Sequence, residues 1–134
     1  MPDTIDPYLF FPGNAEEAAT FYQGAFGGKV EITRRGDVDK DAPVSEKNLI
    51  INASLETDGL TIRMSDRLDT TLDPQTRVEL SIVGRDEQAL RELFDALSDG
   101  GTVRAPLEKM FWGDVFGALT DRFGIGWQVN ISSS

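Results

Sequence analysis

The sequence predicts an α+β fold made of two tandem βαβββ modules. Two observations lead to this prediction. An apolar stripe with helical spacing occurs twice, 72 residues apart, and each stripe is followed by a Gly-Gly pair and three alternating segments. Module one is expected at about residues 4–66 and module two at about 77–132. A polar linker at 67–76 joins them within a single domain, since 134 residues are too few for two ordinary domains.

Module one is expected to begin with a strand at residues 5–11 and to continue into a helix capped by Asn14. Glu17 follows Asn14 by three positions, which is the spacing of a capping box. The apolar stripe of this helix consists of Ala18, Phe21, Tyr22, Ala25 and Phe26. Three strands are then expected at 29–35, 48–56 and 60–65, because apolar and polar residues alternate there.

Module two repeats this order of elements. A strand is expected at 78–83, and Asp86 is the matching cap of the second helix. The stripe of that helix consists of Leu90, Leu93, Phe94 and Leu97. Strands are expected at 102–110, 114–120 and 125–131, so the sequence indicates duplication and fusion of one half-domain.

The composition limits the classes of function. A net charge of −10 disfavours nucleic acids and anionic membranes as partners. No apolar run approaches the roughly 20 residues that a membrane helix needs. The chain has no His and no Cys, which excludes disulfides, thiolate chemistry and catalytic triads that need these residues. These features predict a cytoplasmic protein.

The alternation within the strands predicts which side chains share a face. In the last strand Gln128 and Asn130 oppose Trp127 and Val129. Other strands place Asn52 opposite Ile51, Ala53 and Leu55, and Arg63 opposite Ile62 and Met64. Each sheet is therefore expected to have an apolar face for its helix and a more polar face. The polar faces are either solvated or line a cup, and periodicity does not decide between these alternatives.

The sequence contains five distinctive motifs: Pro7-Tyr8-Leu9-Phe10-Phe11, Gly13-Asn14-Ala15-Glu16-Glu17-Ala18, Phe26-Gly27-Gly28, Phe111-Trp112-Gly113-Asp114 and Thr120-Asp121-Arg122-Phe123-Gly124. They resemble those of PhnB-like proteins, a branch of the vicinal oxygen chelate superfamily that includes glyoxalase I, bleomycin-resistance proteins and extradiol dioxygenases. The resemblance covers roughly residues 5–131. It implies a cup-shaped mixed sheet with the helices on its outer face, and a site that is usually completed in a homodimer.

The resemblance also shows where metal ligands stand in the metal-dependent members, which use His and Glu or Gln side chains. The matching positions here are Pro7, Asn52, Arg63, a position near Arg77, and Gln128. Proline offers no ligand atom, neutral amides bind transition metals poorly, and guanidinium groups repel a cation. We therefore expect no bound metal and no cofactor.

The remaining cup is expected to hold a small organic ligand. The candidate lining residues are Asn52, Arg63, Arg77, Phe111, Trp112 and Gln128. The amides would exchange hydrogen bonds, Arg63 would clamp a carboxylate or phosphate, and Phe111 and Trp112 would form an apolar lid. The alternatives are solvated amides, an ion pair of Arg63 with Glu56 or Glu79, and a structural or dimer role for Trp112.

The leading hypothesis is a dimeric, metal-independent small-molecule binding protein of the glyoxalase/bleomycin-resistance type. One alternative is a metal-dependent lyase or dioxygenase with non-standard ligands. Another is a catalytically silent protein that acts through protein contacts. PhnB-like proteins often carry the name 3-demethylubiquinone methyltransferase. That activity is disfavoured, because the sequence lacks the glycine-rich turn and the parallel βαβ order that an S-adenosylmethionine site normally uses.

Overall fold

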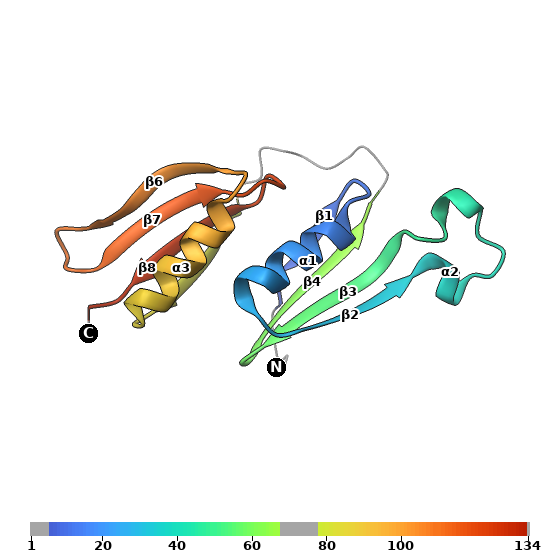
Figure 1. The fold of residues 1–134 in the computed structure, drawn as a ribbon, viewed down its shortest axis with the longest axis horizontal. Helices are drawn as coiled ribbons and strands as arrows, with labels where there is room; N and C mark the ends of the chain where they lie inside the picture. Colours follow the sequence, from blue (N-terminus) through green and yellow to red (C-terminus); the bar gives the residue numbers. More distant parts are fainter. Residues whose placement is uncertain (1–5, 68–77, 134) are drawn as a thin grey trace. The chain divides into compact units, whose positions relative to one another are not determined.

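Residues 6–67 and 78–133 are described by the computed structural model in Figure 1. The chain divides into two compact units, Met1–Leu72 and Asp73–Ser134. They contain the two predicted modules and are called module one and module two below. Arg77 and most of the predicted linker lie outside the described residues. In the part of the chain that is described, no helix is long and apolar enough to span a membrane.

Module one is a four-stranded mixed sheet with one long helix. Its elements are β1 (Tyr8–Phe11), α1 (Ala15–Phe26), β2 (Lys29–Arg34), α2 (Arg35–Val38), a 3₁₀ turn (Val44–Glu46), β3 (Ile50–Thr57) and β4 (Leu60–Asp66). The strand order is β1-β4-β3-β2. Strand β1 runs parallel to β4, and the other neighbouring pairs are antiparallel.

Module two has the same topology. Its elements are β5 (Leu80–Gly84), α3 (Glu87–Ser98), β6 (Thr102–Lys109), β7 (Val115–Thr120) and β8 (Gly126–Ile131). The strand order is β5-β8-β7-β6, with β5 parallel to β8. The prediction of tandem α+β modules is therefore confirmed, and the expected element bounds differ from these by a few residues at most.

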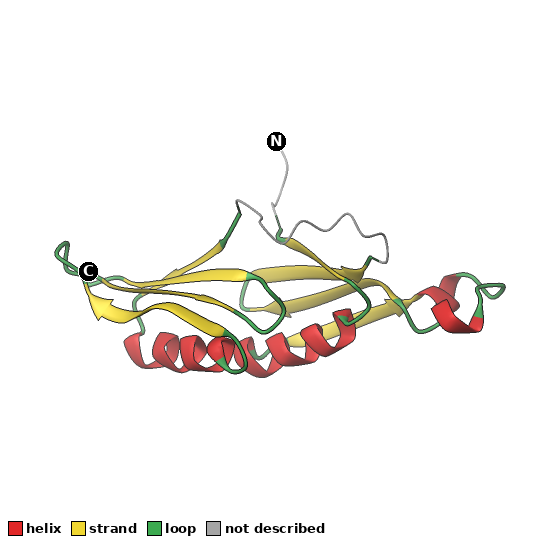
Figure 2. Cartoon of the chain, turned by 90° about the horizontal axis from the view of Figure 1, so that it is seen from above, coloured by secondary structure: helices red, strands yellow, loops and turns green. Residues whose placement is uncertain are grey.

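In each module the long helix packs on one face of the sheet (Figure 2). The buried residues of α1 are Ala15, Ala18, Ala19 and Tyr22, so small side chains bring the helix close to the strands. They pack against a sheet face that includes Phe11, Leu55 and Met64. The core of module two includes Phe94 and Leu97 from α3 and Leu119, Trp127 and Val129 from the sheet. Full burial of each large apolar side chain contributes about 1.5–3 kcal/mol, which favours this one helix position.

The two helices are capped differently. Asp86 accepts a hydrogen bond from the Ala89 amide at 3.1 Å, which confirms its predicted role. The side chain of Asn14 makes no cap bond, so the predicted capping box with Glu17 is wrong. Instead Asp66, at the end of β4, accepts from the Ala15 amide at 2.8 Å and from the Ile50 amide at 2.9 Å. This remote carboxylate satisfies a free amide at the helix start and fixes β3 to α1.

A β-bulge near the start of β3 changes one predicted face. Thr33 pairs with Asn52 and Arg34 pairs with Ile50, so Ile51 has no partner in this register. As a result Ile50 is buried and Ile51 is exposed, which is the reverse of the expected alternation. Farther along β3 the alternation holds, with Ala53 and Leu55 buried on the helix side.

Candidate functional site

The face of each sheet that its helix leaves uncovered is called the open face. In module one the register aligns Tyr8 with Arg63 and Phe10 with Ser65, and it aligns Ser54 with Arg63. Because successive strand residues alternate between faces, Asn52 lies on the same face as Ser54. The open face of module one therefore combines two aromatic rings, an arginine, hydroxyl groups and an amide.

Arg63 is held at one end of its guanidinium group. Its Nε donates to Asp6 Oδ2 at 3.2 Å, and 42% of the Arg63 side chain stays exposed. The sequence predicted an ion pair with Glu56 or Glu79, so the pairing was anticipated but both partners were wrong. Among the described residues the two terminal nitrogens of Arg63 make no hydrogen bond. They remain able to donate to another group.

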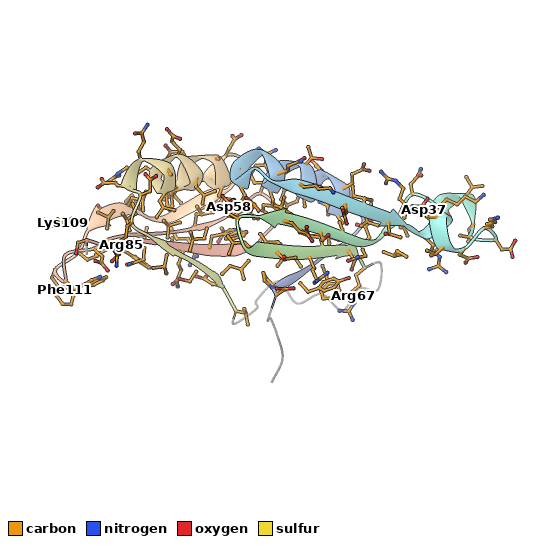
Figure 3. The ribbon with its side chains drawn as sticks, turned by 90° about the horizontal axis from the view of Figure 1, so that it is seen from below. Asp37, Asp58, Arg67, Arg85, Lys109 and Phe111 are labelled. Carbon is orange, nitrogen blue, oxygen red and sulfur yellow. The ribbon has the colours of Figure 1, made fainter. Side chains whose placement is uncertain are left out.

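Tyr8 and Phe10 stack beside Arg63. Their ring centroids lie 4.8 Å apart with an interplanar angle of 19°. The guanidinium carbon of Arg67 lies 4.9 Å from the Phe10 ring centroid, and Figure 3 shows Arg67 on the side of the sheet away from α1. These rings were not among the predicted site residues. The alternation of Tyr8 and Phe10 with the inward-facing Leu9 and Phe11 could have identified them.

On the open face of module two, Gln128 belongs to a network of polar side chains. Gln128 Nε2 donates to Glu79 Oε1 at 3.2 Å, and Arg104 Nη2 lies 3.0 Å from Glu79 Oε2. Arg104 also donates to the Leu119 carbonyl at 3.0 Å. Gly126 leaves room for the carboxylate, because a Cβ there would lie 2.8 Å from Glu79 Oε2. The predicted residue Gln128 is thus part of an internal network with Glu79 and Arg104, which the prediction did not include.

Phe111 and Trp112 lie in the turn between β6 and β7. Figure 3 shows Phe111 at this end of module two. The rings of Phe111 and Trp112 meet edge to face at 4.8 Å, and the side chains are 97% and 51% exposed. The turn is closed by a hydrogen bond from the Gly113 amide to the Met110 carbonyl at 3.0 Å, and Gly113 has φ of 101°. The predicted aromatic pair is therefore exposed on a hairpin, and its role as a lid stays a prediction.

Asp114 anchors this turn to the end of β8. It accepts hydrogen bonds from Asn130 Nδ2 at 3.0 Å and from the Ser133 amide at 3.0 Å. The Asn130 bond, followed by the Ser133 amide, holds the pKa of the Asp114 carboxyl below its ordinary value. Asn130 thereby connects the open face of module two to the aromatic turn.

The predicted site residues thus fall in three places. Asn52 and Arg63 share the open face of module one, Gln128 lies on that of module two, and Phe111 and Trp112 occupy the β6–β7 turn. A separate hollow of about 330 Å³ lies at the β3–β4 turn, lined by Glu56, Thr57, Asp58, Gly59, Leu60 and Thr61. It involves a single hairpin and none of the candidate residues, so we do not assign it to the site.

The residues at the superfamily's metal positions do not fit a divalent ion. Pro7 has no side-chain donor, Arg63 is a cation bound to Asp6, and Gln128 donates its amide to Glu79. No three acidic side chains gather into a metal-binding group within residues 6–67 and 78–133. We therefore derive no step that passes through a metal.

An S-adenosylmethionine site does not fit the described topology either. Strand β1 leads through α1 to β2, which lies at the opposite edge of the sheet. The parallel neighbour of β1 is β4, so β1-α1-β2 is no crossover between adjacent parallel strands. The first amide of α1 is bound by the Asp66 carboxylate rather than directed at a ligand.

Solved glyoxalase/bleomycin resistance/dioxygenase proteins share this fold at 14% and 17% identity, with TM-scores of 0.70 and 0.64. At this identity the likeness shows the fold alone. The family model described as 3-demethylubiquinone-9 3-methyltransferase matches residues 3–130. The chain belongs to that family, the PhnB-like branch of the vicinal oxygen chelate superfamily.

Protein PA1353 from Pseudomonas aeruginosa is 32% identical to the chain, with a TM-score of 0.83 and coverage of 98% of both chains. The PhnB protein from Bacillus cereus, whose name includes the same methyltransferase description, is 26% identical with a TM-score of 0.77. That match covers 97% of this chain and 100% of the other. Protein YjdN from Escherichia coli K12 is 27% identical, over 95% of this chain and 94% of its own length.

Proposed function

We propose that the chain is a small-molecule binding protein of the glyoxalase/bleomycin-resistance type, and that it binds its ligand without a metal ion. The observation that supports this most directly is the open face of module one. There an exposed ring pair lies beside Arg63, whose terminal nitrogens have no partner among the described residues. Such a surface offers stacking and hydrogen bonding but no metal-type donor set. The proposal includes a cytoplasmic homodimer in which both modules belong to one domain.

A thermal-shift screen of small organic molecules tests this proposal. The protein is treated with a chelator and dialysed first, because a ligand that binds the native state raises the melting temperature. We expect at least one class of compound to stabilise the metal-free protein. If compounds act only after Zn²⁺, Mn²⁺ or Fe²⁺ is restored, the metal-dependent lyase or dioxygenase is correct instead.

The family name suggests methyl transfer from S-adenosylmethionine, and we propose that this chain does not perform it. The β1-α1-β2 topology and the occupied start of α1 argue against a site for that cofactor. In calorimetric titrations we expect no heat of binding from S-adenosylmethionine or S-adenosylhomocysteine. Saturable binding of either compound would contradict this part of the proposal.

The exposed turn of module two favours a second candidate function, in which the chain acts through protein contacts. Phe111 and Trp112 present two aromatic rings to solvent on an anchored turn. A Phe111→Ser variant separates the roles of this turn. Loss of ligand-induced stabilisation would indicate a lid, whereas loss of a complex in sedimentation with an unchanged ligand response would indicate a protein contact.

A further inference from the structure

We propose that the ligand is a planar aromatic carboxylate that binds the open face of module one. Its ring would lie against Tyr8 and Phe10, and its carboxylate would bind Arg63. This inference rests on the proposed function and specifies the chemistry of its ligand. All residues of this site lie in the described part of module one.

The rings provide the aromatic part of this site. Tyr8 and Phe10 are 41% and 38% exposed, although both are large apolar side chains on a sheet. They stack at 4.8 Å, and Arg67 extends the column over Phe10 at 4.9 Å. An aromatic ligand can extend or cover such a column, because offset stacking favours flat partners and removes apolar surface from water.

Arg63 provides the recognition of the carboxylate. It is the β4 neighbour of Tyr8 in the parallel register, and Asp6 fixes it through Nε alone. The two terminal nitrogens have no partner in the described part of the chain. The guanidinium group can therefore donate two parallel N–H bonds to the two oxygens of a carboxylate. Two carboxylates lie near this surface: Glu56 is on the same face next to Thr61, farther from Phe10, and Asp6 is already paired with Arg63 Nε.

The described residues of module two do not place an exposed ring pair beside an arginine whose terminal nitrogens are available. Arg104 already binds Glu79 and the Leu119 carbonyl, and Gln128 donates to the same Glu79. The exposed rings of module two lie in the β6–β7 turn and not beside Arg104. We therefore assign the aromatic anion to module one.

The test compares four probes with one ring system: 2-naphthoate, uncharged 2-naphthamide, cationic 2-naphthylmethylamine and 2-naphthyl phosphate. Their dissociation constants are measured by calorimetry on the full chain, with wild type and the variants Arg63→Gln, Arg63→Lys and Tyr8→Leu. Arg91→Gln is the matched control, because Arg91 is a similarly exposed arginine that also pairs through Nε, with Glu87 on α3. Melting temperature and circular dichroism confirm that each variant folds.

We expect 2-naphthoate to bind wild type about tenfold more tightly than 2-naphthamide. Arg63→Gln should abolish that preference, Arg63→Lys should retain part of it, and Tyr8→Leu should weaken all probes that bind. Arg91→Gln should change nothing. If Arg63→Gln does not fold, the Arg63→Lys variant and the comparison of the probes decide the question.

Other outcomes overturn the inference. Equal binding of the amide or amine would show a different ligand class, and a preference for the phosphate would replace the carboxylate. Loss of a dimer in Tyr8→Leu, with 2-naphthoate binding unchanged, would show that a second copy covers the rings. In each case the proposed function survives if other compounds stabilise the metal-free protein, whereas it fails if none does.

Discussion

Asp114 is a residue whose ionisation is tied to neighbouring groups in the structure. Its carboxylate accepts from Asn130 and Ser133, which lowers its pKa from the ordinary value of 3.8. A lowered pKa in the folded state means that folding favours the charged form. The resulting stability is fully present above the unfolded pKa, and it is lost as the pH falls through the folded pKa.

The first prediction follows from the lowered pKa of Asp114. The stability difference between wild type and Asp114→Asn should be constant at neutral pH and should shrink as the pH falls below about 3.8. Urea midpoints measured from pH 3 to 7 check it. A difference that stays the same down to the lowest pH would show that the carboxylate charge does not contribute.

Asp121 is a buried carboxylate with a structural role. It accepts from the Phe123 amide at 2.9 Å, the Ile125 amide at 3.0 Å and the Trp127 indole at 2.8 Å. It therefore closes the β7–β8 turn and orients the largest buried side chain of the core. This explains, in physical terms, why the Thr-Asp-x-Phe-Gly segment precedes that tryptophan.

The second prediction is that Asp121→Asn destabilises the protein by about 1–3 kcal/mol, because an amide nitrogen would replace one of the two carboxylate oxygens that together accept three hydrogen bonds. Urea denaturation measures the change. Asp41→Asn, at an exposed position, is the control and should stay within about 0.5 kcal/mol. Equal effects of the two variants would contradict the role assigned to Asp121.

Strand alternation predicted which individual residues face away from the helices, but it did not predict their partners. Asn52, Arg63 and Gln128 lie on the open faces as expected. The partner of Arg63 is Asp6, which is 57 positions away. Periodicity within one strand contains no information about a pairing over that distance, so the partners proposed from nearby strands were wrong.

At the scale of elements, local signals predicted the helices and strands well and the cap of α1 poorly. Asn14 has the residue type and the spacing of a cap, yet its Oδ1 atom is enclosed and has no hydrogen-bond partner among the residues that the structure describes. Asp66 reaches the Ala15 amide instead. Tertiary structure overrode the local preference because the end of β4 lies at the start of α1. The bulge at Ile51 was missed for the same reason, since it depends on pairing with β2.

The third prediction tests which side chain caps α1. Asp66→Asn should cost about 1–2 kcal/mol, because an amide keeps one acceptor atom where two backbone amides now donate. Asn14→Ala should change stability by no more than about 0.5 kcal/mol, since its side-chain oxygen makes no bond. Thermal and urea denaturation compare the two variants. A larger cost for Asn14→Ala would restore the capping box that the sequence suggested.

At the scale of the whole molecule, the internal repeat made the architecture predictable. Both modules have the topology that the two apolar stripes indicated. The ligand was not predictable to the same degree, because a sequence pattern identifies faces and residue types but not the molecule that binds them. Tyr8 and Phe10 belong to a motif that indicates the family, but the motif does not predict that their rings stack on the surface.

The fourth prediction concerns assembly. The expected homodimer should sediment at twice the chain mass of 14.7 kDa. Because each copy carries a net charge of −10, repulsion between copies should weaken the dimer at low ionic strength, and salt should tighten it. Sedimentation equilibrium in about 20 and about 300 mM NaCl checks both points. A monomer under both conditions would refute the dimer.

The remote cap of α1 also has a consequence for the order of events during translation. Asp86 precedes Ala89 by three residues, so the cap of α3 is synthesised before the helix that it stabilises. Asp66 follows Ala15 by 51 residues, so α1 emerges from the ribosome well before Asp66 emerges. The first helix is therefore completed only when the last strand of its own module arrives, whereas the second helix carries its cap from the beginning.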